Sequence, residues 1–283
     1  MPAGYVCLTF DFDALSAWVA RGVVSATPLS RGEFAAVAVP RLVRLLERRG
    51  LVATWFVPAH TARTYPGLCR DLVAAGHEVA LHGYAHENVA VLDEDTERDL
   101  LARSYDAVAE VIGVAPTGFR APSWDLSDHS VELMVAQGLR YDSSLMGHDH
   151  APYRCRTPDA VDVDGTRWGR ETPLVEIPVS WTLDDFPYLE FLRTGGAVLP
   201  GLRDPRQMFA AWEQDLRWML REVDRGVLTV TCHPEVIGRG HRLLALEQWV
   251  DAVTATDVEV TTCDDVARRY LAGEQLGREP GVG

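Results

Sequence analysis

Six polar residues with side chains suited to hydrolytic chemistry follow short apolar runs in this sequence. They are Asp11, Asp13, His82, Arg120, Asp142 and His233. Each apolar run has the length and composition of a β-strand, so each of these side chains is expected at the end of a strand. In a barrel of parallel strands the carboxyl ends meet on one face, where active sites are built. The six residues therefore predict one pocket, although they are scattered along most of the chain.

Two histidines and two aspartates could form a metal site. His82 and His86 are four positions apart, and one helical turn would let both imidazoles reach one divalent ion. Asp11 and Asp13 flank a phenylalanine at the end of the first expected strand. One carboxylate could complete a site with open positions for water and substrate, and the other could act as a general base. The alternatives are surface histidines and solvated loop carboxylates.

An arginine and a third histidine, with a role other than metal binding, could complete this chemistry. Arg120 begins Arg-Ala-Pro-Ser-Trp, and at a strand end it could pair with the base carboxylate and hold it in place. His233 precedes a proline that fixes the backbone, and a histidine at a strand end can protonate a leaving group. The alternatives are a surface ion pair and a histidine with a structural role.

Apolar runs alternate along the chain with segments of helical period, which predicts parallel strands joined by helical crossovers. Strands are expected at residues 5–10, 52–57, 78–81, 117–119, 139–141, 174–179, 227–231 and 258–261. Helices are expected at residues 40–49, 67–75, 94–112, 127–138, 205–224, 243–253 and 264–271. The spread of polar strand ends along the whole chain favours a closed or nearly closed barrel over a doubly wound open sheet.

Two long segments interrupt this alternation, at residues 14–38 and 146–172. Over the strand ends they would narrow a groove to a pocket, which suits a small ligand better than a polymer. Residues 1–283 are expected to form one domain, with a flexible tail at 274–283.

Composition and charge exclude several classes of partner. The chain has 283 residues and a formal net charge of −14, which disfavours nucleic acid and anionic membranes because both need a basic patch. No apolar stretch approaches the ~20 residues of a membrane span, and the first residues lack the pattern of a signal peptide. Five cysteines without a CxxC pair fit a reducing compartment. We expect a cytoplasmic protein that binds neither nucleic acid nor a membrane.

Four motifs together resemble the polysaccharide deacetylase family, the carbohydrate esterases with a NodB-type domain. They are Thr-Phe-Asp-Phe-Asp at 9–13, His-Gly-Tyr-Ala-His at 82–86, Arg-Ala-Pro-Ser-Trp at 120–124 and Leu-Thr-Val-Thr-Cys-His-Pro at 228–234. The resemblance extends from Tyr5 to about Leu271. It implies an α/β fold, a distorted (β/α) barrel with seven or eight mostly parallel strands.

The resemblance also implies a role for each site residue. The implied ligands of a divalent metal, most often zinc, are Asp13, His82 and His86. Asp11 would be the general base, Arg120 would hold it, and His233 would be the general acid. Asp142 would belong to the polar network around Arg120 or His233.

The sequence departs from the usual family pattern at Phe12, which separates two aspartates that are adjacent in most secreted sugar deacetylases. This feature and Trp-Thr-Leu-Asp-Asp-Phe-Pro at 181–187 resemble a cytoplasmic branch with allantoinase-like enzymes and cyclic imide hydrolases. The branch implies a homo-oligomer, such as a tetramer. The favoured hypothesis is metal-dependent hydrolysis of a C–N amide bond, as in N-deacetylation of an N-acylated amino sugar or a related small amide. The alternatives are ring opening of a cyclic amide or imide, and a non-catalytic carbohydrate-binding barrel.

Several other residues near the strand ends allow two interpretations. Asp184 and Asp185 are interpreted as solvated carboxylates of a loop turn, with substrate contact as the alternative. His148 and His150 are expected to line a loop over the pocket rather than to form a second metal site. Three tryptophans near strand ends could form flat walls for a ring-shaped substrate or pack in the core: Trp18, Trp124 and Trp181.

Overall fold

One mixed sheet organises the protein, for which a computed structural model describes residues 1–194, 197–199 and 201–279. The strand order is β12-β1-β2-β3-β4-β5-β9-β6, and β13 also pairs with β1. The strands of this sheet are β1 (Gly4–Asp11), β2 (Thr54–Val57), β3 (Glu78–Leu81), β4 (Gly118–Phe119), β5 (Tyr141–Asp142), β6 (Tyr153–Arg156), β9 (Glu171–Glu176), β12 (Gly226–Cys232) and β13 (Val258–Thr261). Every pairing is parallel except that of β6 with β9, which is antiparallel.

The sheet curls into a half-barrel, which confirms the expected α/β fold of mostly parallel strands. Within the described residues no strand pairing joins β12 to β9, so the barrel is not closed by strands. Two single contacts cross that gap: a parallel bridge between Asp184 and Thr231, and a hydrogen bond from Val227 N–H to His150 O at 2.9 Å. Loops therefore complete the wall that a closed barrel would build from strands.

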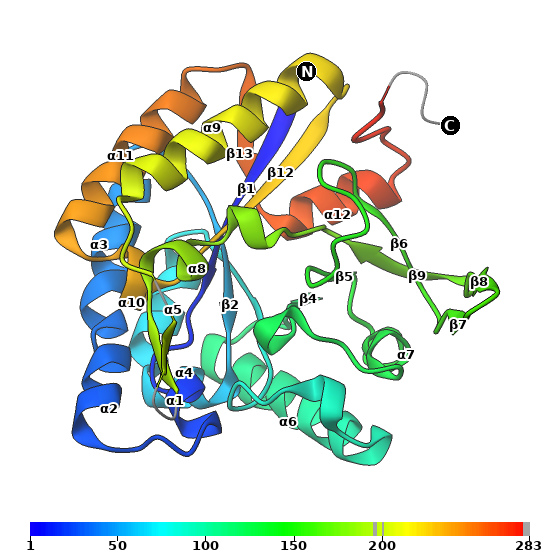
Figure 1. Cartoon of the computed structure of the whole chain (residues 1–283), viewed down its shortest axis with the longest axis horizontal. Coiled ribbons are helices and arrows are strands. Elements are labelled where there is room, and N and C mark those ends of the chain that lie inside the picture. Colours follow the sequence, from blue (N-terminus) through cyan, green and yellow to red (C-terminus); the bar gives the residue numbers. More distant parts are fainter. Residues whose placement is uncertain (195–196, 200, 280–283) are drawn as a thin grey trace.

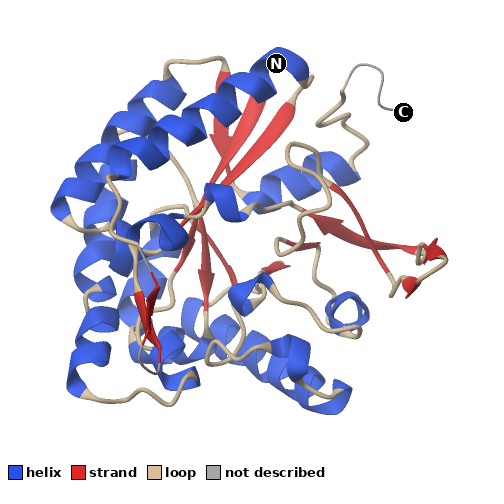
Figure 2. Cartoon of the chain, in the orientation of Figure 1, coloured by secondary structure: helices blue, strands red, loops and turns tan. Residues whose placement is uncertain are grey.

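Helices surround the sheet, as Figure 2 shows. They are α1 (Ser16–Ala20), α2 (Ala26–Glu33), α3 (Ala35–Glu47), α4 (Ala59–Thr64), α5 (Pro66–Ala74), α6 (Glu94–Ile112), α7 (Ser130–Ala136), α8 (Asp185–Leu189), α9 (Pro205–Glu222), α10 (Pro234–Ile237), α11 (Gly240–Thr254) and α12 (Cys263–Leu271). The longest, α6, has the predicted ends: Asp93 accepts from Thr96 N–H, and Gly113 ends the helix at φ 77°. On one side of the sheet α3, α9 and α11 lie together (Figure 1).

The core forms where β1 and β12 are covered on both faces. Every residue of these two strands is buried, which explains their continuous apolar runs. Phe10 in β1 stacks on Trp55 in β2 with ring centroids 4.3 Å apart. On the helical side, Trp212 of α9 packs edge-on against Trp249 of α11 at 5.6 Å. This packing fixes the central strands, whose carboxyl ends carry the candidate residues.

The two long segments have different structures. Residues 14–38 form α1, α2 and the start of α3 beside the carboxyl ends of the strands. Residues 146–172 form β6 and an antiparallel pair, β7 (Ala160–Asp162) and β8 (Gly165–Arg167), whose six residues are all exposed. In Figure 1 this hairpin projects away from the rest of the molecule.

Some elements were not predicted from the sequence. Three short 3₁₀ helices occur, η1 (Val89–Val91), η2 (Pro122–Trp124) and η3 (Trp181–Leu183), and a further hairpin joins β10 (Leu192–Thr194) to β11 (Ala197–Leu199). Residues 274–279, expected in a flexible tail, are instead attached to the start of β12. Asp224 and Arg278 form an antiparallel bridge there, and Gly277 N–H donates to Arg225 O. Residues 280–283 lie outside the described part of the chain.

At the amino end of the sheet, a largely buried polar network joins three strands to α12. We call Thr54, Glu78, Tyr141 and Asp264 the amino-end network. Glu78 accepts from Tyr141 Oη at 2.7 Å, from Thr54 Oγ1 at 2.8 Å and from Asp264 N–H at 3.1 Å. Burial raises the pKa of Glu78 to about 7. A Cβ atom at Gly118 would lie 2.0 Å from Tyr141 Cζ, so only glycine fits beside this network.

No helix in the described ranges is both long enough and apolar enough to cross a membrane.

Candidate active site

The carboxyl ends of β1, β3 and β12 meet at one cavity of about 250 Å³. Five of the sequence-predicted side chains line it: Asp11, Asp13, His82, His86 and His233. Arg120 lies beneath them, with no exposed surface. The structure therefore brings these six side chains together although they lie far apart in the sequence, because the parallel strands end on one face.

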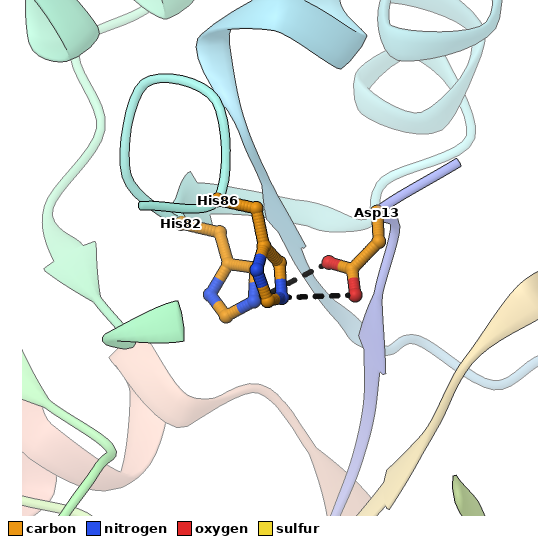
Figure 3. A group of neighbouring side chains, drawn as sticks. All are labelled: Asp13, His82 and His86. Carbon is orange, nitrogen blue, oxygen red and sulfur yellow. Dashed lines mark ion pairs between the residues drawn. The ribbon is translucent and has the colours of Figure 1, made fainter. Parts of the chain in front are cut away.

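Asp13, His82 and His86 lie close together in the cavity, and we call them the metal-ligand group (Figure 3). His82 Nε2 is 3.3 Å from Asp13 Oδ1, and His86 Nε2 is 3.2 Å from Asp13 Oδ2. For bonds of about 2.0–2.1 Å, neighbouring ligands of a tetrahedral ion are roughly 3.3 Å apart. These separations therefore match the edges of such a coordination shell.

Two further observations indicate that a cation fits this group. His82 Nδ1 is 2.8 Å from Arg120 O, and because a carbonyl only accepts, Nδ1 must carry the proton and Nε2 is free to bind a metal. Asp13 Oδ1 is buried without a hydrogen-bond partner. Burial raises the pKa of Asp13, but His86 and His82 lower it more, so its pKa is well below the usual range. An ionised, unsatisfied carboxylate beside two imidazoles is a donor set that suits zinc and similar divalent ions.

The segment between the two histidines is a turn, although the spacing had suggested one turn of helix. Gly83 and His86 have positive φ angles of 69° and 65°, which a helix does not contain. Glu87 stabilises the turn, since its carboxylate accepts from Tyr84 N–H and Ala85 N–H, both at 2.7 Å. The left-handed residue at the end of the turn brings the His86 ring back to Asp13.

Arg120 organises the floor of the site through Asp11. Its Nη1 is 2.7 Å from Asp11 Oδ1 and also donates to Thr9 Oγ1 at 2.8 Å. Nε and Nη2 donate to Ser143 O and Ser143 Oγ, both at 2.9 Å. The guanidinium also lies over Phe56, 4.0 Å from the ring centroid. These contacts fix the Arg120 side chain. The other oxygen of Asp11, Oδ2, is not bound by Arg120 and lies 3.9 Å from His82 Nε2.

Two buried aspartates hold His233. Asp185 Oδ1 is 2.8 Å from His233 Nδ1, and both Asp185 oxygens accept from His233 N–H. Asp184 Oδ1 is 3.6 Å from the same ring nitrogen. Asp184 and Asp185 are 2% and 0% exposed, so the interpretation of both as solvated turn carboxylates is wrong. Residue Asp184 also caps α8 by accepting from Phe186 N–H, which places the pair against β12.

The two aspartates change the proton affinity of His233. Burial lowers the pKa of His233, but Asp184 and the hydrogen bond with Asp185 raise it more, so its pKa is well above the usual range. Burial raises the pKa of Asp184 to about 7. A proton therefore stays on the histidine at neutral pH, with Nε2 facing the cavity 4.0 Å from Asp13 Oδ2.

Asp142 lies behind the site instead of in it. It does not line the cavity, and its Oδ1 accepts from Ser144 Oγ at 2.8 Å, which in turn accepts from Ala121 N–H. Burial raises the pKa of Asp142 to about 6, next to the buried carboxyl group of Glu176. Within the described residues no hydrogen bond or ion pair joins Asp142 to Arg120 or His233. The expected network is therefore reached only through the neighbouring serines.

Aromatic residues form the walls. Trp18, Trp124 and Trp181 all line the cavity, as the sequence allowed, and Trp124 stacks on Trp181 with centroids 4.2 Å apart. Ser123 and Trp124 have φ angles of 58° and 56°, a conformation that costs about 1–3 kcal/mol per residue. The strained backbone of Arg-Ala-Pro-Ser-Trp places the indole of Trp124 at the cavity wall.

The two long segments contribute unequally to the walls. Residues 14–38 supply Trp18 and two arginines, which confirms their predicted place over the pocket. No residue of 146–172 lines this cavity, so the same prediction for that segment is wrong. His150 is buried where its carbonyl accepts from the start of β12, and His148 lines a separate cavity. His148, Asp149 and Glu279 have donor atoms within 4.8 Å of one another, a grouping that the sequence did not indicate.

Sequence reasoning missed five charged residues that line the cavity: Arg21, Arg31, Glu190, Glu235 and Arg239. Glu235 follows the His-Pro pair by one position, which was the only available signal. Burial raises the pKa of Glu235 well above its usual range, and its Oε2 is buried without a partner. The arginines lie in loops and short helices, where no periodic pattern marks them.

The arrangement can support hydrolysis by a general base and a general acid that both lie beside the metal-ligand group. Asp11 is an acceptor held by an arginine, and His233 is a protonated donor held by two carboxylates. Both face the metal-ligand group within 4.0 Å. Acid and base groups kept apart in this way can act on a water molecule and a leaving group within one pocket.

Comparisons with known proteins identify the family of this chain. A family model described as polysaccharide deacetylase matches residues 1–141. A peptidoglycan deacetylase of Helicobacter pylori is 35% identical over 276 residues, which cover 92% of this chain and 94% of that protein. A peptidoglycan deacetylase-like protein of Gibberella zeae is 29% identical over 96% of this chain and 87% of its own length.

Solved structures give the same result. The crystal structure of a putative polysaccharide deacetylase from Mycobacterium smegmatis superposes with a TM-score of 0.85 at 33% identity, covering 100% of this chain and 94% of that one. An allantoinase superposes with a TM-score of 0.78 at 20% identity over 96% of this chain and 91% of its own, which shows similarity of fold alone. The chain therefore belongs to the polysaccharide deacetylase family and is a hydrolase that acts on carbon–nitrogen bonds.

Proposed function

We propose that this protein is a metal-dependent deacetylase of an N-acylated amino sugar or a related small amide. One observation carries the proposal: the metal-ligand group lies in one cavity between an arginine-held carboxylate, Asp11, and an aspartate-held imidazole, His233. A non-catalytic carbohydrate-binding barrel would have no need of this complete set. The relatives named as peptidoglycan deacetylases support an N-acetylated sugar as the substrate class.

The metal-ligand group would hold a divalent ion, most simply zinc. Such an ion supplies a Lewis acid that polarises an amide carbonyl and makes a water molecule more acidic. Asp11 accepts the proton of the attacking water at Oδ2, because Oδ1 is already engaged by Arg120. Arg120 keeps this carboxylate oriented throughout the reaction, since its other donors are fixed to the backbone and side chain of Ser143.

His233 provides the proton for the leaving nitrogen. Its Nδ1 is engaged by Asp185, so the proton that faces the cavity is on Nε2. An amine leaves from a tetrahedral carbon only when its nitrogen is protonated, which makes this donor necessary. Asp142 is proposed to act indirectly, by ordering Ser144 and the backbone at Ala121, which follows Arg120.

The cavity favours a small substrate. Its volume of about 250 Å³ and its tryptophan walls suit one ring, which an indole can cover with a flat apolar face.

We propose a cytoplasmic location. All five cysteines are buried and free, in agreement with the reducing compartment expected from the sequence. We also propose the expected homo-oligomer, which sedimentation of the purified protein would test.

An assay against three classes of compound tests the proposal. Purified protein loaded with zinc is incubated with N-acetylglucosamine derivatives, with chitin or peptidoglycan fragments, and with allantoin and succinimide. We expect the protein to release acetate from a small N-acetyl sugar faster than from any polymer. The Asp11→Asn variant should release no acetate. Ring opening of allantoin or succinimide without acetate release from any sugar would contradict the deacetylase assignment and favour the cyclic amide alternative.

A further inference from the structure

Three arginines from separate segments line the same cavity as the metal-ligand group. Arg21 follows α1, Arg31 is in the last turn of α2, and Arg239 precedes α11. The same cavity is lined by five carboxylates, so each arginine has possible acidic partners nearby: Asp11, Asp13, Asp184, Glu190 and Glu235. The catalytic steps proposed above use none of the three.

Arg31 is already neutralised. It forms an ion pair with Glu190 at 2.7 Å, and its guanidinium lies over Trp18 and Phe191, 4.9 and 5.0 Å from the ring centroids. This pair joins α2 to the end of α8 and so closes one side of the cavity. Its role in the structure is therefore accounted for without a ligand.

Arg21 and Arg239 have no such partner. Neither forms an ion pair with a carboxylate of the described residues, and residues 192–200 contain no aspartate or glutamate. Both are nevertheless held by aromatic rings. The Arg239 guanidinium lies 3.5 Å from the centroid of Phe34, and that of Arg21 lies 5.7 Å from the centroid of Trp18.

A guanidinium that stacks on a ring keeps its N–H edge free. That edge matches the two oxygens of a carboxylate or a phosphate, and the strongest charge-assisted hydrogen bonds form in this geometry. Because the Arg239 guanidinium already lies close over Phe34, its side chain loses less conformational entropy when an anion binds. Arg21 is exposed and contributes mainly its charge. Deeper in the cavity, Asp11 pairs with Arg120, and Asp184 lies 3.6 Å from Nδ1 of His233.

We propose that the substrate carries an anionic group, a carboxylate or a phosphate, which Arg21 and Arg239 bind while the N-acyl group reaches the metal-ligand group. This inference rests on the proposed function and narrows its substrate class. A neutral amino sugar would occupy the aromatic walls but leave both guanidinium groups without an ion pair. The two arginines would then select a charged sugar over its neutral analogue.

Binding of matched sugars tests the inference. The zinc-loaded Asp11→Asn protein is titrated calorimetrically with four compounds of one ring type: N-acetylglucosamine, its 1-phosphate, its 6-phosphate and N-acetylmuramic acid, which carries a carboxylate. We expect at least one anionic compound to bind about 10-fold or more tightly than the neutral sugar, and the preferred compound identifies the anion. The preference should decrease as salt screens the charges.

Charge-removing variants provide the control. Arg21→Gln with Arg239→Gln should abolish the preference for the anion, expressed as the ratio of the two dissociation constants. Arg217→Gln with Arg221→Gln, on α9 and away from the cavity, removes the same charge and should retain it. A ratio near one in the starting protein, or a preference that survives loss of Arg21 and Arg239, would overturn the inference.

Parallel turnover measurements separate this failure from failure of the proposed function. Hydrolysis of neutral and anionic sugars with equal kcat/KM would leave the deacetylase assignment intact and overturn the anion preference. If no sugar of either charge is bound or hydrolysed while allantoin or succinimide is opened, both the assignment and the inference are wrong.

Discussion

The two ends of the sheet both contain buried polar clusters, but only one is complete by itself. In the amino-end network, both oxygens of Glu78 accept hydrogen bonds from protein donors. At the carboxyl end, Asp13 Oδ1 and Glu235 Oε2 are buried without partners. Buried polar atoms are normally satisfied, so unsatisfied ones that converge on a cavity indicate where a ligand belongs. The amino-end cluster stabilises the fold, and the carboxyl-end cluster is prepared for chemistry.

The two clusters also use glycine and strain differently. Gly118 at the amino end lets the Tyr141 ring pack against the backbone, which is a packing requirement. At the carboxyl end, four non-glycine residues have positive φ angles: Ala14, His86, Ser123 and Trp124. Strained backbone of this kind is maintained only where the surrounding structure fixes it, and functional sites are where it concentrates.

The largest expected effect is loss of a metal ligand. His82→Ala or His86→Ala should lower activity by roughly 10³-fold or more, above the 10–100-fold typical for loss of a supporting partner. Chelation of the unaltered protein should have the same effect, with recovery on adding zinc. Elemental analysis and an activity assay check both, and His129→Ala, which removes an exposed histidine, is the control. Full activity in metal-free protein would show that this group does not bind a catalytic metal.

The next largest effect separates the roles of the two aspartates that flank Phe12. Asp11→Asn should retain the metal and lose about 10²–10⁴-fold in rate, because asparagine keeps the shape but not the basic oxygen. Asp13→Asn should lose the metal as well. Metal content per protein measures the difference. If Asp11→Asn empties the metal site and Asp13→Asn does not, the assigned roles are reversed.

A smaller effect is expected at Asp185, which helps to raise the pKa of His233. The general acid must be protonated, so activity declines as the pH rises through the pKa of this histidine. Asp185→Asn removes one negative charge, lowers that pKa and should move the alkaline limb of the kcat/KM profile to lower pH. Glu132→Gln on the exposed face of α7 is a charge-matched control. If the alkaline limb does not move, it reports the titration of a group other than His233.

The smallest effect belongs to the amino-end network and concerns stability. Glu78 has a pKa of about 7 when folded, above the ordinary value of 4.5, so its protonated form is favoured by folding. The resulting stabilisation is complete below about pH 4.5 and is lost as the pH rises through 7, a change of about 3 kcal/mol. Glu78→Gln should flatten this part of the pH dependence of the unfolding free energy. Urea unfolding between pH 4 and 8 measures it, and an unchanged slope would contradict the assignment.

Local patterns predicted the parts of the molecule that depend on local physics. The apolar runs marked the strands, Asp93 and Gly113 marked the ends of α6, and the residue after each strand marked most of the site. The family resemblance then separated the roles of Asp11 and Asp13, which spacing alone left open.

The parts that the sequence did not predict depend on distant contacts. Asp184 and Asp185 have the local features of a solvated turn, and only β12, 48 residues away, buries them against His233. Arg21 and Arg239 meet at the cavity through loops, where no periodicity exists to detect. The position of residues 146–172 follows from the antiparallel pairing of β6 with β9, which no local pattern specifies.

Anomalous diffraction from crystals grown with zinc tests most directly the claim that the carboxyl end of the sheet is completed by a metal. The account predicts one strong peak at the zinc edge, about 2.0–2.2 Å from Nε2 of His82, Nε2 of His86 and an oxygen of Asp13. It predicts no comparable peak at the amino-end network. Absence of a peak at the metal-ligand group, or a stronger peak at His148, Asp149 and Glu279, would contradict the central claim.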